Sequence, residues 1–408
     1  MKTSRNPRLF YGYIVVVAAV SILTLSWGAN RSFGVFLEPM LDDFGWTRAS
    51  ISGAFTLSMA MYGLLSIVAG RISDRFGPQI LLIGCGVFLG LGYLLSSQVT
   101  AVWQFYVFYG LITGVGLSGC HAPLFTVIAR WFTKRRALMS GIAAAGPTMG
   151  ILVMPVAFSF LISAHGWRLS YIFLGGIVLL VLIPAALFLK RDPSESGVLP
   201  FGSDKAKLQN TSFQAEGASL SEAIRTRQFW LLNIIAFFDT FLINVIVVHI
   251  VIHATDLGIA NAAAATILSV AAGVSIPARI IIGGVADRIG NRPALIIILV
   301  ASVVAFSLLL ITRELWMFYL FAFLYGIGLW SSIGILPPLM ADLFGLKSHA
   351  TIFSFTVLAG AIGGALGPVL AGYIFDVTGT YQLAFIICLV GSIIALIASI
   401  MVRPVTRR

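Results

Sequence analysis

The chain has 408 residues, of which 59% are apolar and only 10% are charged, and its net charge is +11 at pH 7. This composition excludes an ordinary soluble domain, in which about a quarter of the residues are charged. Apolar stretches long enough to cross a hydrocarbon core of about 30 Å as helices recur from Tyr11 almost to the end of the chain. We therefore expect a protein that crosses a lipid bilayer many times.

Twelve apolar stretches predict twelve transmembrane helices. The first six predicted helices span residues 11–37, 48–69, 79–98, 103–129, 138–164 and 171–189. The last six span residues 228–253, 259–283, 293–312, 315–341, 351–375 and 381–402. The first stretch is too long for a cleaved signal peptide and is followed at once by further spans, so we expect it to stay in the protein.

Residues 190–227 form the one long polar stretch between the two sets of helices. We interpret it as a cytoplasmic linker that ends in a short helix, because Ser219 and Glu222 have the spacing of a capping box. The sequence therefore predicts an N-terminal six-helix bundle, a cytoplasmic linker and a C-terminal six-helix bundle, over residues 1–190, 191–227 and 228–408.

Lysine and arginine residues gather in short loops at alternate helix ends. This distribution follows the positive-inside rule of membrane proteins, so the basic charge does not indicate nucleic acid as a partner. With the N-terminus in the cytoplasm, the outer loops receive only three of the 26 basic residues, namely Arg48, Arg168 and Arg313. We therefore expect both termini in the cytoplasm.

The three cysteines, Cys85, Cys120 and Cys388, lie in apolar stretches and have no paired spacing. The sequence thus predicts neither a disulfide framework nor a metal site. It also shows no nucleophile beside a general base, so we expect no enzymatic activity and no cofactor.

The two halves of the chain repeat each other at a nearly constant offset. Gly70-Arg-Ile-Ser-Asp-Arg-Phe-Gly77 in the first half returns as Gly283-Gly-Val-Ala-Asp-Arg-Ile-Gly290 in the second. At almost the same offset, Gly114-Val-Gly116 returns as Gly326-Ile-Gly328. An internal repeat of this length predicts two pseudo-symmetric bundles of six helices each.

The repeated pattern Gly-x-x-x-Asp-Arg-x-Gly resembles the loop signature of the major facilitator superfamily, and the resemblance covers the whole chain. It implies an all-helical membrane protein with the major facilitator fold that works by alternating access. The acidic and basic residues of both copies are expected to bridge helix ends and hold the cytoplasmic face shut. This expected cytoplasmic gate comprises Asp74, Arg75, Asp287 and Arg288.

Two further segments resemble one branch of that superfamily, the monocarboxylate transporters and oxalate/formate antiporters, bacterial members included. They are Trp131-Phe-Thr-Lys-Arg-Arg-Ala-Leu-Met-Ser-Gly141 and Ser26-Trp-Gly-Ala-Asn-Arg-Ser-Phe-Gly-Val-Phe36. His249 followed by Asp256-Leu-Gly258 matches the branch too. The resemblance implies a monomeric carrier of small organic anions in a bacterial inner membrane.

Arg279 is the deepest cation in the predicted helices. It lies about 12 Å along the helix from Asp287, at 1.5 Å per residue, which is too deep to reach the surface easily. Its repeat counterpart is Ser66, so the charge is an asymmetric addition to a symmetric scaffold. A guanidinium can bind a carboxylate through two parallel hydrogen bonds. In monocarboxylate transporters the substrate-binding arginine lies on the eighth helix, and the resemblance implies this role for Arg279.

Asp239 in the seventh helix is predicted at a depth near that of Arg279. The two can form a structural salt bridge. They can also couple a proton to the substrate, because protonation of Asp239 would free Arg279 for an incoming anion. The alternative is that Asp239 only packs inside the bundle.

Two other polar residues are candidates for the transport pathway. Arg31 matches a lysine that monocarboxylate transporters use near the outer end of the pathway, and since arginine keeps its proton we expect it to attract anions. Alternatively, Arg31 extends outward or pairs with Glu38. His121, at a depth comparable to Arg279, can bind substrate or carry a proton, or it packs against its neighbours.

Several neutral residues are expected to line the cavity. Trp27 and Asn30 lie about one helical turn apart and face the same way. The repeat equates Ser118 with Trp330, both beside the Gly-x-Gly kinks, and Ala144 is expected to contact an alkyl group. Each aromatic residue has the alternative of a lipid or packing contact.

The predicted substrate is a small monocarboxylate such as lactate, pyruvate, acetate or formate. Oxalate carriers of this branch have a lysine in the eleventh helix, where this chain has Gly360. With a single central cation, a second buried carboxylate of the substrate would lack a partner.

The leading hypothesis is a secondary symporter with protons as the coupling ion. An organic-anion exchanger of the oxalate/formate type shares every feature above. A ligand-sensing protein would need an output module that signals to a partner. An arginine deep in the membrane is less expected in a carrier of drugs or sugars.

Overall fold

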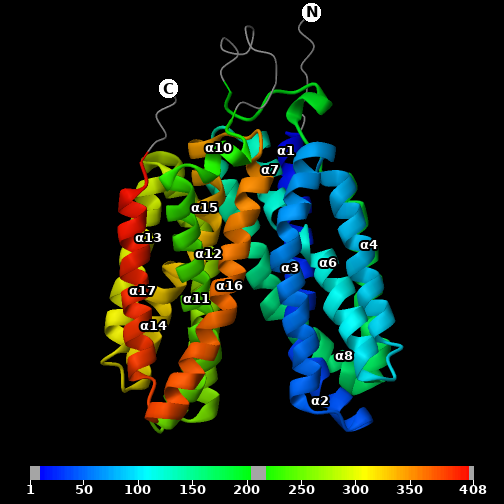
Figure 1. Ribbon diagram of the computed structural model, residues 1–408, viewed down its shortest axis with the longest axis vertical. Helices are drawn as coiled ribbons and strands as arrows, with labels where there is room; N and C mark the ends of the chain where they lie inside the picture. Colours follow the sequence, from blue (N-terminus) through cyan, green and yellow to red (C-terminus); the bar gives the residue numbers. More distant parts are fainter. Residues whose placement is uncertain (1–9, 204–216, 404–408) are drawn as a thin grey trace, which may run out of the picture.

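The computed structural model describes residues 10–203 and 217–403, which fold into long helices arranged in two groups (Figure 1). The first group contains α1 (Tyr11–Arg31), α2 (Phe33–Phe44), α3 (Arg48–Phe76), α4 (Pro78–Ser96), α5 (Val102–Phe105), the π-helix η1 (Tyr106–Ile112), α6 (Thr113–Ser118), α7 (Ala122–Trp131) and α8 (Arg136–Leu187). The second group contains α11 (Arg227–Asp256), α12 (Asn261–Ile289), α13 (Asn291–Leu309), α14 (Leu315–Ile327), α15 (Leu329–Phe344), α16 (His349–Thr378) and α17 (Gln382–Met401).

The expected twelve crossings are confirmed. Within the described residues, eleven continuous stretches are long and apolar enough to cross a membrane. The longest of them, α8, has 52 residues and contains two crossings that meet at Gly166, where φ is 80° and ψ is 165°. This backbone conformation suits glycine, because a side chain is strained at positive φ.

A short 3-10 helix, η2 (Pro193–Ser196), and α10 (Leu220–Ile224) lie between the two groups. At the start of α10, the Ser219 amide donates to the Glu222 carboxylate at 2.7 Å, and the Glu222 amide donates to the Ser219 hydroxyl at 3.3 Å. These two bonds form the expected capping box. The hydrogen bonds from Ser219 also hold the pKa of Glu222 below its usual value.

The second and eighth crossings are longer than predicted. They were expected to end at residues 69 and 283, but α3 and α12 continue to Phe76 and Ile289. Gly77 and Gly290, with φ of 93° and 97°, follow the last residues of these helices. The Asp-Arg pairs of the repeated signature therefore lie in the last helical turns and not in loops. Apolar periodicity ends with the hydrocarbon core, whereas backbone hydrogen bonding continues into the polar region.

Two crossings are broken near their middle. The fourth breaks between α6 and α7, at Gly119 to His121, and the tenth breaks at Gly328, whose ψ is −106°. The repeat placed the first of these kinks at Gly114–Gly116, and that position is wrong, because both glycines lie in regular helix. Gly116 instead allows α6 to pack closely against the backbone of α4 at Leu89.

Phe10 and Arg403, the first and last described residues, lie at the same end of the helices, which we call the terminal end (Figure 1). The opposite end is the distal end, toward which the two groups of helices diverge (Figure 1). Hydrogen bonds between the halves lie in the terminal part of the helices. Among the described residues, these bonds join Ser66 with Ser354, Thr126 with His349, Arg130 with Leu346, Arg136 with Asp342, Ala144 with Arg279, Asp74 with Ala350 and Thr351, and Asp287 with Ala137 and Leu138.

Gly283 lies where α12 meets the start of α8. A Cβ atom added to Gly283 would lie 2.6 Å from the Ala137 carbonyl oxygen and 2.9 Å from Leu138 Cα. Because a backbone yields less easily than a flexible side chain, we expect Gly283→Ala to lower the free energy of unfolding by about 1–3 kcal/mol. Thermal unfolding of the purified protein in detergent measures this effect.

Gly284 is the matched control for this substitution. A Cβ atom at Gly284 would meet Leu138 Cδ1 at 3.8 Å, an ordinary contact distance. Gly284→Ala is therefore expected to keep or raise the melting temperature, since alanine favours a helix over glycine by about 0.5–1 kcal/mol. Equal destabilisation by the two substitutions would contradict a close contact specific to Gly283.

Candidate functional site

Arg279 lies at the contact between the two halves and is only 4% exposed. Its Nε atom donates to the Trp330 carbonyl oxygen at 2.7 Å, and its Nη1 atom donates to the Ala144 carbonyl oxygen. Within the described residues the guanidinium has no carboxylate partner. A buried cation held by neutral oxygens retains an uncompensated charge, which an anion can neutralise.

The broken tenth crossing positions the main-chain partner of Arg279. α15 restarts at Leu329 after the break, so Trp330 lies in the first turn of the new helix. The Trp330 indole donates to the Tyr325 hydroxyl at 3.1 Å, and that hydroxyl donates to the Ile243 carbonyl at 3.1 Å. The indole lies 6.0 Å from the centre of the Arg279 guanidinium. Trp330 thus contacts the arginine through both its ring and its carbonyl oxygen.

Ala144 comes from the other half of the molecule. It was expected to offer its methyl group to a substrate, but its contact with Arg279 is made by the backbone carbonyl, and its side chain is fully buried. Gly334 packs beside it, and a Cβ atom added to Gly334 would lie 3.1 Å from Gly141 Cα and 3.5 Å from Ala144 Cβ. The small residues of α8 and α15 therefore bring the two backbones close enough for Arg279 to reach across.

Asp239 is 2% exposed, and neither of its carboxyl oxygens has a hydrogen-bond partner in the described part of the chain. The expected ion pair with Arg279 is not formed in this conformation. The Ser332 hydroxyl of α15 donates to the Leu329 carbonyl at 2.7 Å and not to Asp239. A carboxyl group in such surroundings avoids a large desolvation cost when it is protonated.

A cluster of aromatic rings joins residues of both halves of the chain. It consists of Trp27, Tyr62, His121, Phe125 and Phe353. The Trp27 ring lies 5.3 Å from Tyr62 and 6.1 Å from His121, and the His121 ring lies 5.9 Å from Phe353. Four crossings from both halves therefore contribute to this cluster, and they bring the predicted residues Trp27 and His121 together.

Unpaired polar atoms gather next to the aromatic cluster. Trp27 Nε1, Arg31 Nε and His121 Nδ1 are buried and have no hydrogen-bond partner among the described residues. The Arg31 guanidinium lies 6.0 Å from the Trp27 ring and forms no ion pair with Glu38 within those residues. The N–H groups of Trp27 and Arg31 are hydrogen-bond donors, and the Arg31 guanidinium near the Trp27 ring is positively charged. This region therefore favours an anionic ligand over a cationic one.

Asn30 and Ser118 are less directly connected to this region. Asn30 is 1% exposed, its carbonyl oxygen accepts a hydrogen bond from the Tyr109 hydroxyl at 3.3 Å, and its side-chain oxygen has no partner in the described chain. Ser118 is buried and donates to Val115 within its own helix at 2.7 Å. Its hydroxyl is thus directed to its own helix and not to Arg279.

The two aspartates of the repeated signature join the halves at the terminal end. Asp74 accepts hydrogen bonds from the Ala350 and Thr351 amides at 3.3 and 2.8 Å, at the start of α16. Asp287 accepts hydrogen bonds from the amides of residues 137 and 138 at 2.9 and 3.0 Å, at the start of α8. The two pairs of amides are related by the same offset in the sequence as the two aspartates. Each carboxylate therefore caps a helix N-terminus of the opposite half, where negative charge is favoured.

The arginines of the signature do not take part in these contacts. Arg288 is exposed, and Arg75 is exposed with its guanidinium 5.1 Å from the Phe76 ring. Of the four signature residues, Asp74 and Asp287 contact helix ends of the opposite half, and their role as a gate stays a prediction. Other arginines form the ion pairs at the terminal end.

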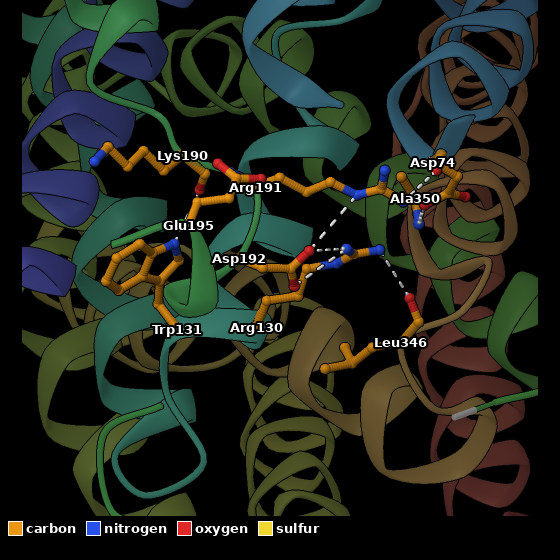
Figure 2. Close-up of polar contacts among 9 residues, drawn as sticks. All are labelled: Asp74, Arg130, Trp131, Lys190, Arg191, Asp192, Glu195, Leu346 and Ala350. Carbon is orange, nitrogen blue, oxygen red and sulfur yellow. Dashed lines mark hydrogen bonds and ion pairs between the residues drawn. The ribbon is translucent and has the colours of Figure 1, made fainter. Parts of the chain in front are cut away.

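The network around Asp192 contains two of those arginines (Figure 2). Arg130 donates to both Asp192 carboxylate oxygens at 3.0 and 3.3 Å, and to the Leu346 carbonyl of the other half at 3.1 Å. Arg191 lies 3.7 Å from Asp192 and donates to the Asp74 carbonyl at 2.5 Å. The first residues of the linker thus hold the ends of α3 and α7 beside the second half.

Sequence reasoning missed this network, although the repeat contained a signal for it. Arg130 and Asp342 are related by the offset of the repeat, so opposite charges occupy equivalent places in the two halves. Asp342 binds Arg136 of the first half at 3.1 Å. His349 is the first residue of α16, and its ring nitrogens contact Thr126 at 2.8 Å and the Pro337 carbonyl at 3.0 Å.

Comparison with known sequences agrees with this architecture. The sequence model of the Major Facilitator Superfamily matches residues 16–236 and again residues 229–408. Monocarboxylate transporter 11 of Mus musculus is 27% identical over 400 residues, which cover 95% of this chain and 86% of that protein. Monocarboxylate transporter 13 of Bos taurus is 28% identical over 381 residues, covering 92% and 86%. Human monocarboxylate transporter 2 is 25% identical over 401 residues, covering 93% and 82%.

Solved structures share the fold at lower sequence identity. The Major Facilitator Superfamily transporter FucP, in the outward conformation, has a TM-score of 0.73 at 16% identity, over 95% of this chain and 98% of that one. The proton:xylose symporter XylE also has a TM-score of 0.73, at 12% identity, over 95% and 94%. The chain therefore belongs to the major facilitator superfamily, as a multi-pass secondary transporter of small molecules that is similar to the monocarboxylate transporters and is not an enzyme.

Proposed function

We propose that this protein carries a small monocarboxylate anion of the lactate, pyruvate, acetate or formate type, together with a proton, by alternating access. The observation that carries the proposal is the Arg279 guanidinium, buried between the halves and held by two main-chain carbonyl oxygens, with no counter-charge among the described residues. One carboxylate neutralises it. A second carboxylate on the same substrate would have no equivalent partner there.

The chemistry of each side chain suggests which part of the substrate it contacts. Arg279 binds the carboxylate, while Trp330, Trp27 and the neighbouring residues bound the space for the remainder of the molecule. Arg31 and His121 each have a nitrogen atom without a hydrogen-bond partner in the described chain, and we place both residues on the proposed approach from the distal end. Together with Asn30, Ser118 and Ala144 they complete the proposed set of substrate-contacting residues.

Asp239 is the proposed proton carrier. Its carboxyl group is buried without a partner in the described part of the chain, so it binds a proton readily in the conformation seen here. Loss of that proton creates a negative charge inside the same bundle as Arg279, and the two charges then attract each other. Substrate and proton are thus bound together and released together, which is the requirement of symport.

The terminal end is the proposed cytoplasmic side of a bacterial inner membrane, with both termini in the cytoplasm. Support comes from the basic residues, which favour the cytoplasmic loops. Asp74 and Asp287 then act as the cytoplasmic gate, together with the arginines of the Asp192 network, in place of Arg75 and Arg288. In this proposal the conformation described above is the one closed to the cytoplasm, and the monomer opens when residues 1–190 and 228–408 move as two units.

Uptake into proteoliposomes tests the proposed function. Labelled lactate, pyruvate, acetate, formate and oxalate are each supplied with and without an inward proton gradient. We expect uptake of at least one monocarboxylate, stimulated by the gradient, and no uptake of oxalate. Uptake that depends only on an internal counter-substrate would favour the exchanger instead, and preference for oxalate would contradict the argument from a single cation.

A further inference from the structure

Phe201 of the linker pairs with the turn between α7 and α8 at the terminal end. Its amide donates to the Trp131 carbonyl at 2.9 Å, and its carbonyl oxygen accepts hydrogen bonds from the Thr133 and Lys134 amides at 3.1 and 3.0 Å. The Thr133 hydroxyl donates to the same oxygen at 2.8 Å. The Trp131 carbonyl belongs to the last turn of α7, where a helix leaves its carbonyl groups without internal partners. The main chain of the linker is therefore fixed to this turn.

The Phe201 ring packs among aromatic rings of the first half. Its centre lies 5.6 Å from the Phe10 ring, 6.3 Å from the Tyr13 ring and 5.9 Å from the Phe132 ring. The Arg135 guanidinium lies 5.6 Å from the centre of the Phe201 ring. Aromatic pairs and cation–π pairs at such separations are attractive. The ring therefore connects the start of α1 with Arg135, at the end of the turn.

Arg135 has an uncommon backbone conformation. Its φ is 63° and its ψ is 24°, and among the described residues it is the only one other than glycine with a positive φ. A residue with a Cβ atom is unfavourable in this left-handed region, so its surroundings must hold it there. Arg135 is the N-cap residue of α8, and its carbonyl accepts a hydrogen bond from the Met139 amide at 3.0 Å. The conformation of Arg135 therefore sets the direction in which α8 begins.

The residues that follow Arg135 contact the second half of the chain. The amides of residues 137–138 donate to the Asp287 carboxylate at 2.9 and 3.0 Å, and Arg136 binds Asp342 at 3.1 Å. Hydrogen bonds weaken steeply when their length or angle departs from the optimum. A change of backbone direction at Arg135 would therefore separate the start of α8 from Asp287.

The second described part of the linker makes an equivalent contact in the other half. The Ala218 amide donates to the Phe344 carbonyl at 2.7 Å, and Gly217 pairs with Gly345 in an antiparallel bridge. This turn precedes α16, and Asp74 accepts hydrogen bonds from amides in the first turn of that helix. Each part of the linker thus pairs with the turn before a helix that a signature aspartate caps.

We propose that Phe201 is a positioning residue of the transporter, which holds Arg135 in the left-handed conformation and so keeps the start of α8 where Asp287 can cap it. This role rests on the proposed function, in which Asp287 belongs to the cytoplasmic gate. Without the ring, Arg135 is free to adopt a negative φ, the start of α8 turns away from Asp287, and the gate opens more readily. The linker is then a working part of the gate.

Phe201→Ala is expected to expose the contact between the halves from the terminal end. Ser354 is fully buried there, and its main-chain carbonyl accepts a hydrogen bond from the Ser66 hydroxyl at 3.2 Å. The probe is Ser354→Cys in the full-length protein in lipid nanodiscs, and a hydrophilic maleimide reaches it only when the halves separate. Phe201→Ala, compared in this background, should raise the rate of labelling at least about fivefold, the lower end of typical couplings between distant sites.

The native Cys85 distinguishes opening of the gate from unfolding. It is buried inside the first half, away from the contact between the halves, and should stay unlabelled in Phe201→Ala. Mass spectrometry of the digested protein reports each cysteine separately. Labelling of Cys85 together with the probe would show that the Phe201 ring supports only the fold, and would overturn its role in the gate.

Three further variants make the test specific. Phe201→Tyr keeps the ring and should label as slowly as the parent protein. Arg135→Asn, added to Phe201→Ala, should slow the labelling again, because asparagine adopts a positive φ more readily than most residues. Phe76→Ala is the matched control, since the Phe76 ring also lies near an arginine, Arg75 at 5.1 Å, but is 57% exposed. It should leave the labelling unchanged.

Unchanged labelling in Phe201→Ala, an equal rise in Phe76→Ala, or no recovery with Arg135→Asn overturns the positioning role. Asp287→Ala separates this outcome from a failure of the proposed gate, because it removes the cap itself. If Asp287→Ala does not raise the labelling of the probe, the cytoplasmic gate is wrongly assigned. If it does and Phe201→Ala does not, only the role of Phe201 is refuted.

Discussion

Arg279→Ala is expected to abolish concentrative uptake of every carboxylate that the wild type transports. The substitution removes the buried cation and leaves the substrate anion without a partner in a desolvated place, a change that costs about 3–5 kcal/mol when one member of a buried ion pair is removed. This corresponds to a loss of affinity of at least about a hundredfold. Initial uptake rates in proteoliposomes, and thermal stabilisation of the purified protein by each acid, measure it.

Two variants separate binding from folding in this experiment. Arg279→Lys keeps the charge but replaces the planar fork by a single ammonium group, so it cannot serve the Trp330 carbonyl, the Ala144 carbonyl and a substrate with the same geometry. We expect weak residual binding in Arg279→Lys. Arg75→Ala removes an exposed arginine and should behave as the wild type in binding. Saturable carboxylate transport in Arg279→Ala would exclude Arg279 as the substrate anchor.

Asp239→Asn is expected to uncouple transport from the proton gradient. Asparagine has nearly the same shape as a protonated aspartic acid but cannot release a proton, so the carrier stays in the proton-loaded form. Net uptake driven by an inward proton gradient should fall to the background level, whereas exchange of carboxylate across the membrane should continue. Both are measured in the same proteoliposomes at external pH values from 5 to 8.

Glu38→Gln provides the comparison, because Glu38 is an exposed acid on the distal side of the same protein. It is expected to show the pH profile of the wild type. Loss of exchange together with uptake in Asp239→Asn would indicate that the residue supports the structure and does not carry the proton. An unchanged pH profile would remove Asp239 from the mechanism altogether.

The twelve helices could be predicted because membrane insertion depends on composition over about twenty residues, which a single sequence displays fully. The depth of Arg279 along its helix was also accessible, since helical rise converts sequence distance into depth. Helix ends were less accessible: α3 and α12 continue past their apolar parts, and hydropathy does not follow backbone hydrogen bonds beyond the hydrocarbon core.

The partners of the candidate residues could not be predicted in the same way. Arg279 binds the carbonyls of Trp330 and Ala144, and a backbone carbonyl is present at every position, so nothing in the sequence marks the ones that are used. Asp239 and Arg279 have similar depth but face different neighbours, because rotation of each helix about its axis is set by packing.

The reciprocal contacts of Asp74 and Asp287 have a consequence for how the molecule is assembled. The end of α3 meets the start of α16, and the end of α12 meets the start of α8, through partners that the repeat relates to each other. This is the isologous arrangement of a two-fold dimer, in which the same patch is offered by each subunit to the other. A connection between two such subunits raises their effective concentration without creating the contact. The two halves therefore hold each other as the subunits of a homodimer do.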